Sequence, residues 1–143
     1  MPLEAVAINT FDAPLMRQMN QENELSVRIG KLFEQHADFS NKETGAESAI
    51  ALFETAFRQG AVLYVGMFND KPIVVMGCFD DGQTDARRLQ YLATHPENQN
   101  RGIEGRFIKQ VYDAEVKKGI RRFVPVDETI HQIMAEYEML SVK

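Results

Sequence analysis

The residues best suited to chemistry lie in a short loop, residues 99–104 (QNRGIE), which runs directly into an amphipathic helix. The first turn of a helix presents unpaired backbone N–H groups and a partial positive charge. A glycine such as Gly102 lets the backbone approach a bound group closely, so a loop of this kind can hold a phosphate or pyrophosphate. Short glycine-bearing loops before helices are also common without any ligand, and the spacing alone favours that purely structural interpretation.

Hydrophobic periodicity predicts the elements that position this loop. Their order is strand 3–8, one or two helices within 15–36, helix 49–57, strands 61–68, 72–79 and 87–95, helix 103–118, strand 120–126 and helix 128–140. Asp12 and Pro14 are typical of a helix start, and Gly60 of a helix end. A meander of strands followed by a strand-helix-strand crossover predicts an α+β (mixed α/β) fold, with a mostly antiparallel sheet flanked by helices.

Length and composition limit the classes of protein to consider. A chain of 143 residues indicates a single domain, residues 1–143, and the net charge of -5 argues against general nucleic-acid binding. Cys78 is the only cysteine, so an internal disulfide is excluded, and no Cys/His spacing predicts a metal site. The sequence has neither the pattern of a secretion signal nor a membrane-length apolar run, so we expect a cytoplasmic protein that does not enter membranes.

The residues of the loop carry more information than their spacing. PENQNRGI, residues 96–103, resembles the acyl-CoA-binding signature Q/R-x-x-G-x-G/A of the GNAT N-acetyltransferase superfamily, in which a strand ends, a loop wraps the pyrophosphate and a helix begins. The predicted element order is also that of the superfamily. YEMLSV, residues 137–142, looks like a degraded form of its Tyr-Glu-x-Leu-Gly-Phe motif. The resemblance covers most of the chain from Ala61 onward, and the N-terminal helices match in order only.

The resemblance implies an acyl-CoA-dependent N-acyltransferase, in which a primary amine attacks acetyl-CoA directly. The acceptor would be a small-molecule amine or an amine of a protein. Backbone groups at the end of the fourth strand would pair with the pantetheine arm, and the loop would hold the pyrophosphate. Tyr137 would take the place of a tyrosine that protonates the leaving thiolate. The implied acyl-CoA-binding residues are Leu92, Ala93, Thr94, Gln99, Asn100, Arg101, Gly102, Ile103 and Glu104.

Two features depart from the superfamily pattern. Glu104 stands where the signature has its second small residue, and its carboxylate would repel a pyrophosphate unless it turns outward or is offset by Arg101 and Arg106. Only residues 141–143 follow the last predicted helix, where the superfamily adds two strands. We therefore expect shortened C-terminal strands, and a homodimer that completes the sheet becomes a hypothesis.

The sequence shows no carboxylate in residues 89–94 to act as the base that deprotonates the amine. The nearby candidates are Asp127, Glu128 and His95, although His95 is better interpreted as a loop residue. His36 and His131 are predicted to be solvated. Cys78 and the remaining tyrosines, Tyr64, Tyr91 and Tyr112, are predicted to be core or half-buried residues without a chemical role.

These departures support a second hypothesis, a non-catalytic or regulatory module of the same fold that binds CoA or a protein partner. Binding of CoA in a one-to-one ratio without turnover of any amine would favour this module over an enzyme. A structural protein whose loop binds nothing is a third and weaker alternative.

Overall fold

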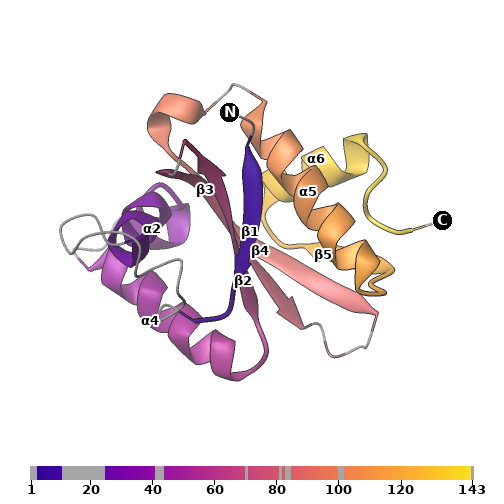
Figure 1. Cartoon of the computed structure of the whole chain (residues 1–143), viewed down its shortest axis with the longest axis horizontal. Helices are drawn as coiled ribbons and strands as arrows, with labels where there is room; N and C mark the ends of the chain where they lie inside the picture. The colour runs from indigo at the N-terminus through magenta and orange to yellow at the C-terminus, as the bar shows by residue number, and fades with distance from the viewer. Residues whose placement is uncertain are drawn as a thin grey trace.

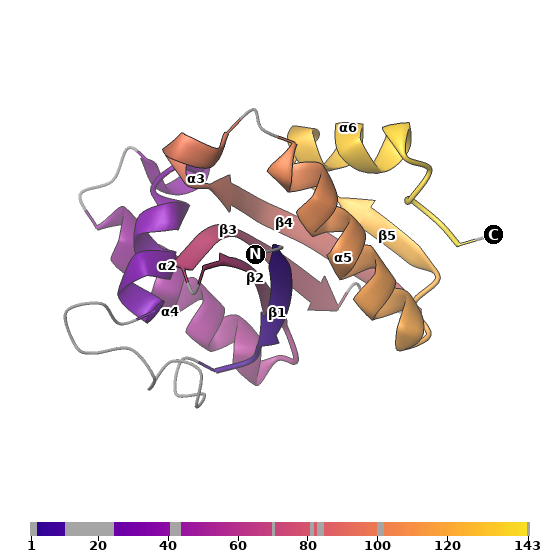
Figure 2. The same cartoon turned by 45° about the horizontal axis from the view of Figure 1, so that its top comes forward.

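The computed structural model describes residues 3–10, 25–40, 44–69, 71–80, 82, 85–99 and 102–142. A five-stranded sheet lies between two groups of helices (Figures 1 and 2). The strands are β1 (Glu4–Ile8), β2 (Val62–Phe68), β3 (Lys71–Asp80), β4 (Ala86–Thr94) and β5 (Arg122–Pro125). The helices are α2 (Leu25–Phe33), α3 (Ala37–Ser40), α4 (Gly45–Arg58), α5 (Ile103–Lys117) and α6 (Glu128–Glu136), with a short 3-10 helix, η2 (Pro96–Asn98), before α5.

The strands follow their chain order across the sheet, from β1 to β5. Each neighbouring pair is antiparallel except β4 and β5, which are parallel and are joined by the crossover helix α5. The predicted mixed α/β fold with a mostly antiparallel sheet is therefore confirmed. After α6 the chain returns beside β5, where Ser141 bridges to Arg122 and the Val142 N–H donates to the Arg121 carbonyl at 2.8 Å. The homodimer stays a prediction, and a purely monomeric mass in light scattering would count against it.

The two faces of the sheet build two apolar cores, because successive side chains of a strand point to opposite faces. Val75 and Phe79 of β3 pack with the α2 and α4 side, whereas Val74 and Met76 pack with the α5 and α6 side. This arrangement fixes α5 against the sheet and so fixes the position at which the helix begins. None of the helices in the described parts of the chain is long and apolar enough to cross a membrane.

The helix boundaries differ from the predictions at several places. The predicted helix start at Asp12 and Pro14 lies outside the described residues, as does the first part of the predicted helical region 15–36. Helix α2 ends at Phe33 rather than at residue 36, and α3 follows it without having been predicted. Helix α6 ends at Glu136 rather than at residue 140, because Glu138 adopts a left-handed conformation with φ of 55°.

Candidate functional site

The predicted loop connects the end of β4 to the start of α5. Gly102 is the N-cap of α5 and has φ of 74°, a left-handed angle that favours glycine. A Cβ atom at this position would meet nothing within 4 Å, so the backbone angle rather than space calls for glycine. Ile103 and Phe107 are buried and anchor the helix in the core. Asn100 and Arg101 lie outside the described residues.

Strand β4 changes its hydrogen-bonding pattern at Tyr91. This residue has φ of 64°, which costs an L-residue about 1–2 kcal/mol, and the register between β3 and β4 shifts nearby. On the other side, the pairing of β4 with β5 reaches only Leu89 opposite Pro125. Among the described residues, the last part of β4 therefore presents an edge on this side.

The side chain of Asp127 binds to this edge of β4. It is the N-cap residue of α6, yet its carboxylate makes no hydrogen bond to that helix and reaches across to β4 instead. Oδ2 accepts the Leu92 N–H at 2.9 Å, Oδ1 accepts the Tyr91 N–H at 3.3 Å, and the His36 Nε2–H donates to Oδ2 at 3.0 Å. Burial by itself would raise the pKa of Asp127, but the hydrogen bonds from His36 and Leu92 outweigh burial and hold this pKa below its ordinary value.

The prediction that His36 is solvated is wrong, because only 13% of its side chain is exposed. Its Nδ1 accepts the Asp38 N–H at 3.1 Å, which assigns the proton on Nε2 to the bond with Asp127. The hydrogen bond to Asp127 raises the pKa of His36 above 6.5, against the lowering effect of burial. No local pattern points to this pair, because 91 positions separate the two residues in the sequence.

A hollow of about 630 Å³ opens beside Asp127 and is called the acidic hollow here. Its lining residues are Gln35, His36, Ala37, Asp38, Gln90, Leu92, Ala93, Thr94, Gln99, Glu104, Val126, Asp127, Glu128 and Thr129. Four of them carry carboxylates and none is Lys or Arg. The hollow brings together Leu92, Ala93, Thr94, Gln99 and Glu104 of the predicted site with the candidate bases Asp127 and Glu128. Within the described ranges, no three His, Cys, Asp or Glu side chains gather as metal ligands would.

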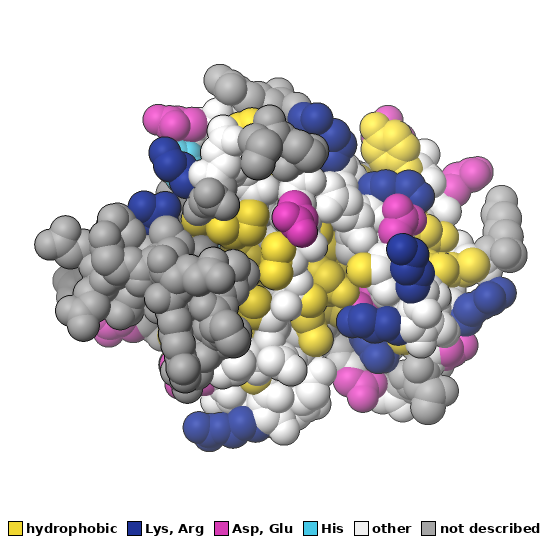
Figure 3. Space-filling model, viewed as in Figure 1, with side chains coloured by type: hydrophobic (Ala, Val, Ile, Leu, Met, Phe, Trp, Pro, Cys, Tyr) yellow, Lys and Arg dark blue, Asp and Glu magenta, His cyan; other side chains and the backbone are white. Residues whose placement is uncertain are grey.

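Tyr137 lies elsewhere, in a second hollow of about 590 Å³ between α5 and the end of α6. This tyrosine hollow is lined by Gly102, Gly105, Arg106, Lys109, Gln110, Tyr112, Tyr137, Glu138 and Met139. Figure 3 shows Lys and Arg side chains over the part of the surface that α5 occupies in Figure 1. The first turn of α5 thus separates an acidic side, which Glu104 faces, from a basic side, which Arg106 faces. Tyr137 is 61% exposed and is not brought together with Asp127.

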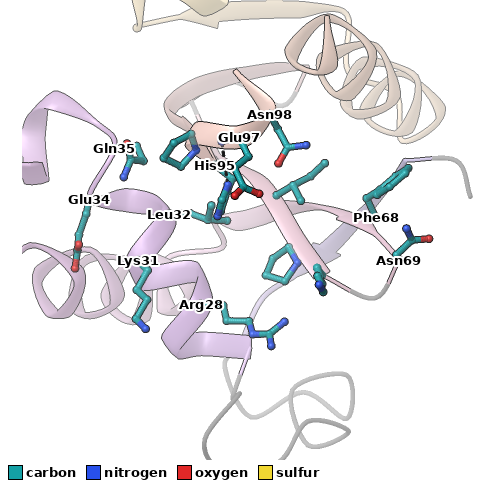
Figure 4. A pocket seen from close by; sticks show the side chains of 14 residues that line it. Arg28, Lys31, Leu32, Glu34, Gln35, Phe68, Asn69, His95, Glu97 and Asn98 are labelled. Carbon is teal, nitrogen blue, oxygen red and sulfur yellow. Dashed lines mark hydrogen bonds between the residues drawn. The ribbon is translucent and has the colours of Figure 1, made fainter. Parts of the chain in front are cut away.

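A third hollow, of about 750 Å³, lies between α2, the turn that joins β2 to β3, and η2 (Figure 4). Arg28, Lys31 and Lys71 outnumber the acidic Glu34 and Glu97 in its lining, so it is called the basic hollow. His95 lies here rather than beside Asp127, and its Nδ1 accepts the Glu97 N–H at 3.1 Å as a cap of η2. Gln35 lines both this hollow and the acidic one, so the two adjoin at the end of β4.

Comparisons with known proteins give a result for the fold. No protein-family model matches the chain, and no curated protein matches it. Solved structures do match. An aminoglycoside 6'-acetyltransferase of type Ii superposes with a TM-score of 0.65 at 14% identity, over 100% of this chain and 83% of that one.

Two further structures agree. A protein from Desulfovibrio desulfuricans assigned to the GNAT family of acetyltransferases has a TM-score of 0.64 at 12% identity, over 96% of this chain and 82% of that one. A protein from Clostridium acetobutylicum, described as an acetyltransferase and solved with acetyl-CoA, has a TM-score of 0.58 at 14% identity, over 95% and 88%. The chain therefore has the fold of the GNAT acetyltransferases.

Proposed function

We propose that this protein is an acyl-CoA-dependent N-acyltransferase that transfers acetyl from acetyl-CoA to a primary amine. One observation carries the proposal: the edge of β4 at Leu92 lies beside a helix that begins at a left-handed glycine, in a fold shared with acetyltransferases. In the reaction, the amine nitrogen attacks the thioester carbonyl carbon, the C–S bond breaks, and CoA leaves as a thiolate that takes up a proton.

The cofactor side of the proposal assigns the pantetheine arm to the β4 edge formed by Leu92, Ala93 and Thr94. The pyrophosphate is assigned to the loop 99–104. The charges around α5 support a location on the side of Gly102 and Arg106, because Glu104 faces the acidic hollow instead. This separation answers the objection that the Glu104 carboxylate would repel the pyrophosphate.

The acceptor side of the proposal assigns the amine to the acidic hollow. A charged amine is attracted by carboxylates, and Asp127 and Glu128 can receive a proton or hold the ammonium group. Tyr137 is kept as the proposed proton donor to the thiolate. Because Tyr137 lies in the tyrosine hollow and the thioester is assigned to the β4 edge, this role requires the end of α6 to move toward that edge when acyl-CoA binds.

Acetyl-CoA binding to two glycine variants tests the cofactor site. Gly102 and Gly119 have φ of 74° and 98°, and a Cβ atom at either would meet nothing within 4 Å. Gly102→Glu and Gly119→Glu therefore both place an L-residue at a positive φ and add the same charge, at opposite ends of α5. We expect isothermal titration to give a Kd at least about ten-fold higher for Gly102→Glu and nearly unchanged for Gly119→Glu. Equal binding by both variants would contradict the proposal.

A regulatory module that binds CoA or a partner without turnover is the second candidate function. The observation that favours it is the separation of Tyr137 from Asp127 into different hollows. A panel of primary amines, including a polyamine and a lysine peptide, distinguishes the two candidates. Release of free CoA with any amine supports the enzyme, whereas tight acetyl-CoA binding without release supports the module.

A further inference from the structure

We propose that Asp127 is a displaceable cap on the β4 amides, which gives way to the acyl carbonyl when acyl-CoA binds and then caps its own helix, α6. The inference rests on the proposed function, since it concerns the edge of β4 that the acyl-CoA would use. It adds a residue that controls access to that edge.

The edge of β4 is already occupied by side chains of the protein. The His95 N–H donates to the Ile73 carbonyl on β3, so by alternation the backbone groups of Leu92 and Thr94 face away from β3. The Leu92 N–H is held by Asp127 Oδ2 at 2.9 Å, and the Thr94 carbonyl accepts the Gln99 Nε2–H at 3.1 Å. Side chains of the protein thus occupy the two ends of the segment where a ligand would pair. An acyl carbonyl and the Asp127 carboxylate cannot occupy the same N–H together.

The displaced carboxylate has a second set of donors available at the start of α6. A charged group that leaves its donors is costly unless other donors replace them. Asp127 already stands at the N-cap of α6, where an aspartate side chain normally accepts the N–H of the second or third helical residue. In this chain those residues are Thr129 and Ile130, and α6 has no side-chain cap while Asp127 reaches β4. A rotation of one side chain therefore exchanges one set of amide donors for another.

His36 holds the Asp127 cap on β4. Its Nε2–H donates to the same oxygen that accepts the Leu92 N–H. Both ring nitrogens are engaged, because Nδ1 accepts the Asp38 N–H. His36 is therefore a positioning residue for Asp127 rather than a base that acts on the amine.

Acetyl-CoA titration of Asp127→Ser tests the inference. Serine caps a helix well but is too short to reach β4, so the variant keeps α6 capped and leaves the Leu92 amide free. We expect the Kd for acetyl-CoA to fall about five-fold. Asp38→Asn is the matched control, because it removes one charge from the same hollow while Asp127 keeps its hydrogen bonds to β4. Its Kd should change less than two-fold.

The outcomes separate the inference from the proposed function. Binding by Asp127→Ser that is unchanged or weaker than wild type would overturn the inference alone, and so would an equal gain in Asp38→Asn, which would point to charge only. No binding by any of the three proteins would overturn the proposed function as well. Amide resonances give a second test in the wild type. Acetyl-CoA should shift Leu92 together with Thr129 or Ile130, and a shift of Leu92 alone would contradict the exchange.

Discussion

Two carboxylates, one near each end of α5, lie in different surroundings. Near its C-terminal end, Glu115 is only 1% exposed and is surrounded by donors. Its carboxylate accepts the Tyr64 hydroxyl, pairs with Lys118 Nζ at 2.8 Å and Arg87 Nε at 3.4 Å, and contacts the Cys78 thiol at 3.6 Å. Burial by itself would raise the pKa of Glu115, but the bonds from Lys118 and Tyr64 outweigh it and lower this pKa. Donors from β2, β3, β4 and the C-cap residue of α5 enclose this carboxylate.

Near the N-terminal end, Asp127 also has a lowered pKa and several donors, but a hollow lies beside it. A perturbed carboxylate can therefore mark either a structural ion pair or a site for chemistry. The difference lies in what adjoins the group. Glu115 holds secondary structure together, whereas Asp127 has room beside it for a ligand and an alternative set of donors.

The largest effect on stability is expected at Glu115, near the C-terminal end of α5. Glu115→Ala removes the acceptor of the buried Tyr64 hydroxyl and leaves a cavity, so it should lower the free energy of unfolding by about 3–4 kcal/mol in urea denaturation. Asp113→Ala is the control on the same helix. Its carboxylate is half exposed and pairs with Lys109 at 2.9 Å, so its effect should stay below about 0.5 kcal/mol. Similar effects of the two changes would remove the contrast between a buried and an exposed pair.

Alkaline pH should lower stability through two buried groups that contact Glu115. Burial raises the pKa of the Cys78 thiol above its ordinary 9.0 and that of the Tyr64 hydroxyl above 10.0. Both groups stay neutral in the folded protein but ionise in the unfolded chain, so stability is lost as pH rises above about 9. Each titrating group should contribute up to about 1.4 kcal/mol per pH unit. Cys78→Ala should reduce this slope between pH 9 and 10.5, and an unchanged slope would contradict the assignment to Cys78.

For the pair of His36 and Asp127, the effect of pH on stability should appear near neutrality. The pKa of His36 is raised in the folded state, so its contribution is fully present below 6.5 and is lost as pH rises through the folded pKa. The pKa of Asp127 is lowered, so its contribution is lost only in acid, below 3.8. His36→Gln should therefore cost about 1 kcal/mol at pH 5.5 and less at pH 8.5. A cost that does not change with pH would mean that the pair carries no net charge interaction.

The smallest effect is expected from Gly105→Ala in the first turns of α5. The added Cβ would lie 3.9 Å from the Tyr137 ring, and alanine favours a helix over glycine, so the protein should gain about 0.5–1 kcal/mol. If acetyl-CoA lies against Gly105 in the tyrosine hollow, the added methyl group should also weaken its binding. A gain in stability without loss of binding would show that this side of α5 does not contact the ligand.

Periodicity and turn residues were sufficient for most of the architecture. Strands β2, β3 and β4 have regular apolar patterns, and the glycine of the loop marks the start of α5. Helix α3, with four residues, is too short for a periodic pattern to predict it. The left-handed Tyr91 could not be predicted either, because an aromatic residue carries no preference for that angle.

The site was only partly accessible to sequence reasoning. Asp127 was among the candidate bases because it follows the fifth strand, but its bond to His36 depends on the packing of α2 against β4. The separation of Tyr137 from Asp127 depends on where α6 ends and how it lies against α5. Such distances follow from tertiary packing, which local pattern does not encode.

Cys78 has a practical consequence for experiments on this protein. It is the single cysteine of the chain, it is buried, and its thiol resists ionisation. Maleimide reagents need an accessible thiolate, so they should leave the native protein unmodified at neutral pH. A cysteine introduced at Gln35, between the acidic and basic hollows, would then be the single reactive position. A fluorescent dye attached there could report directly on the filling of either hollow.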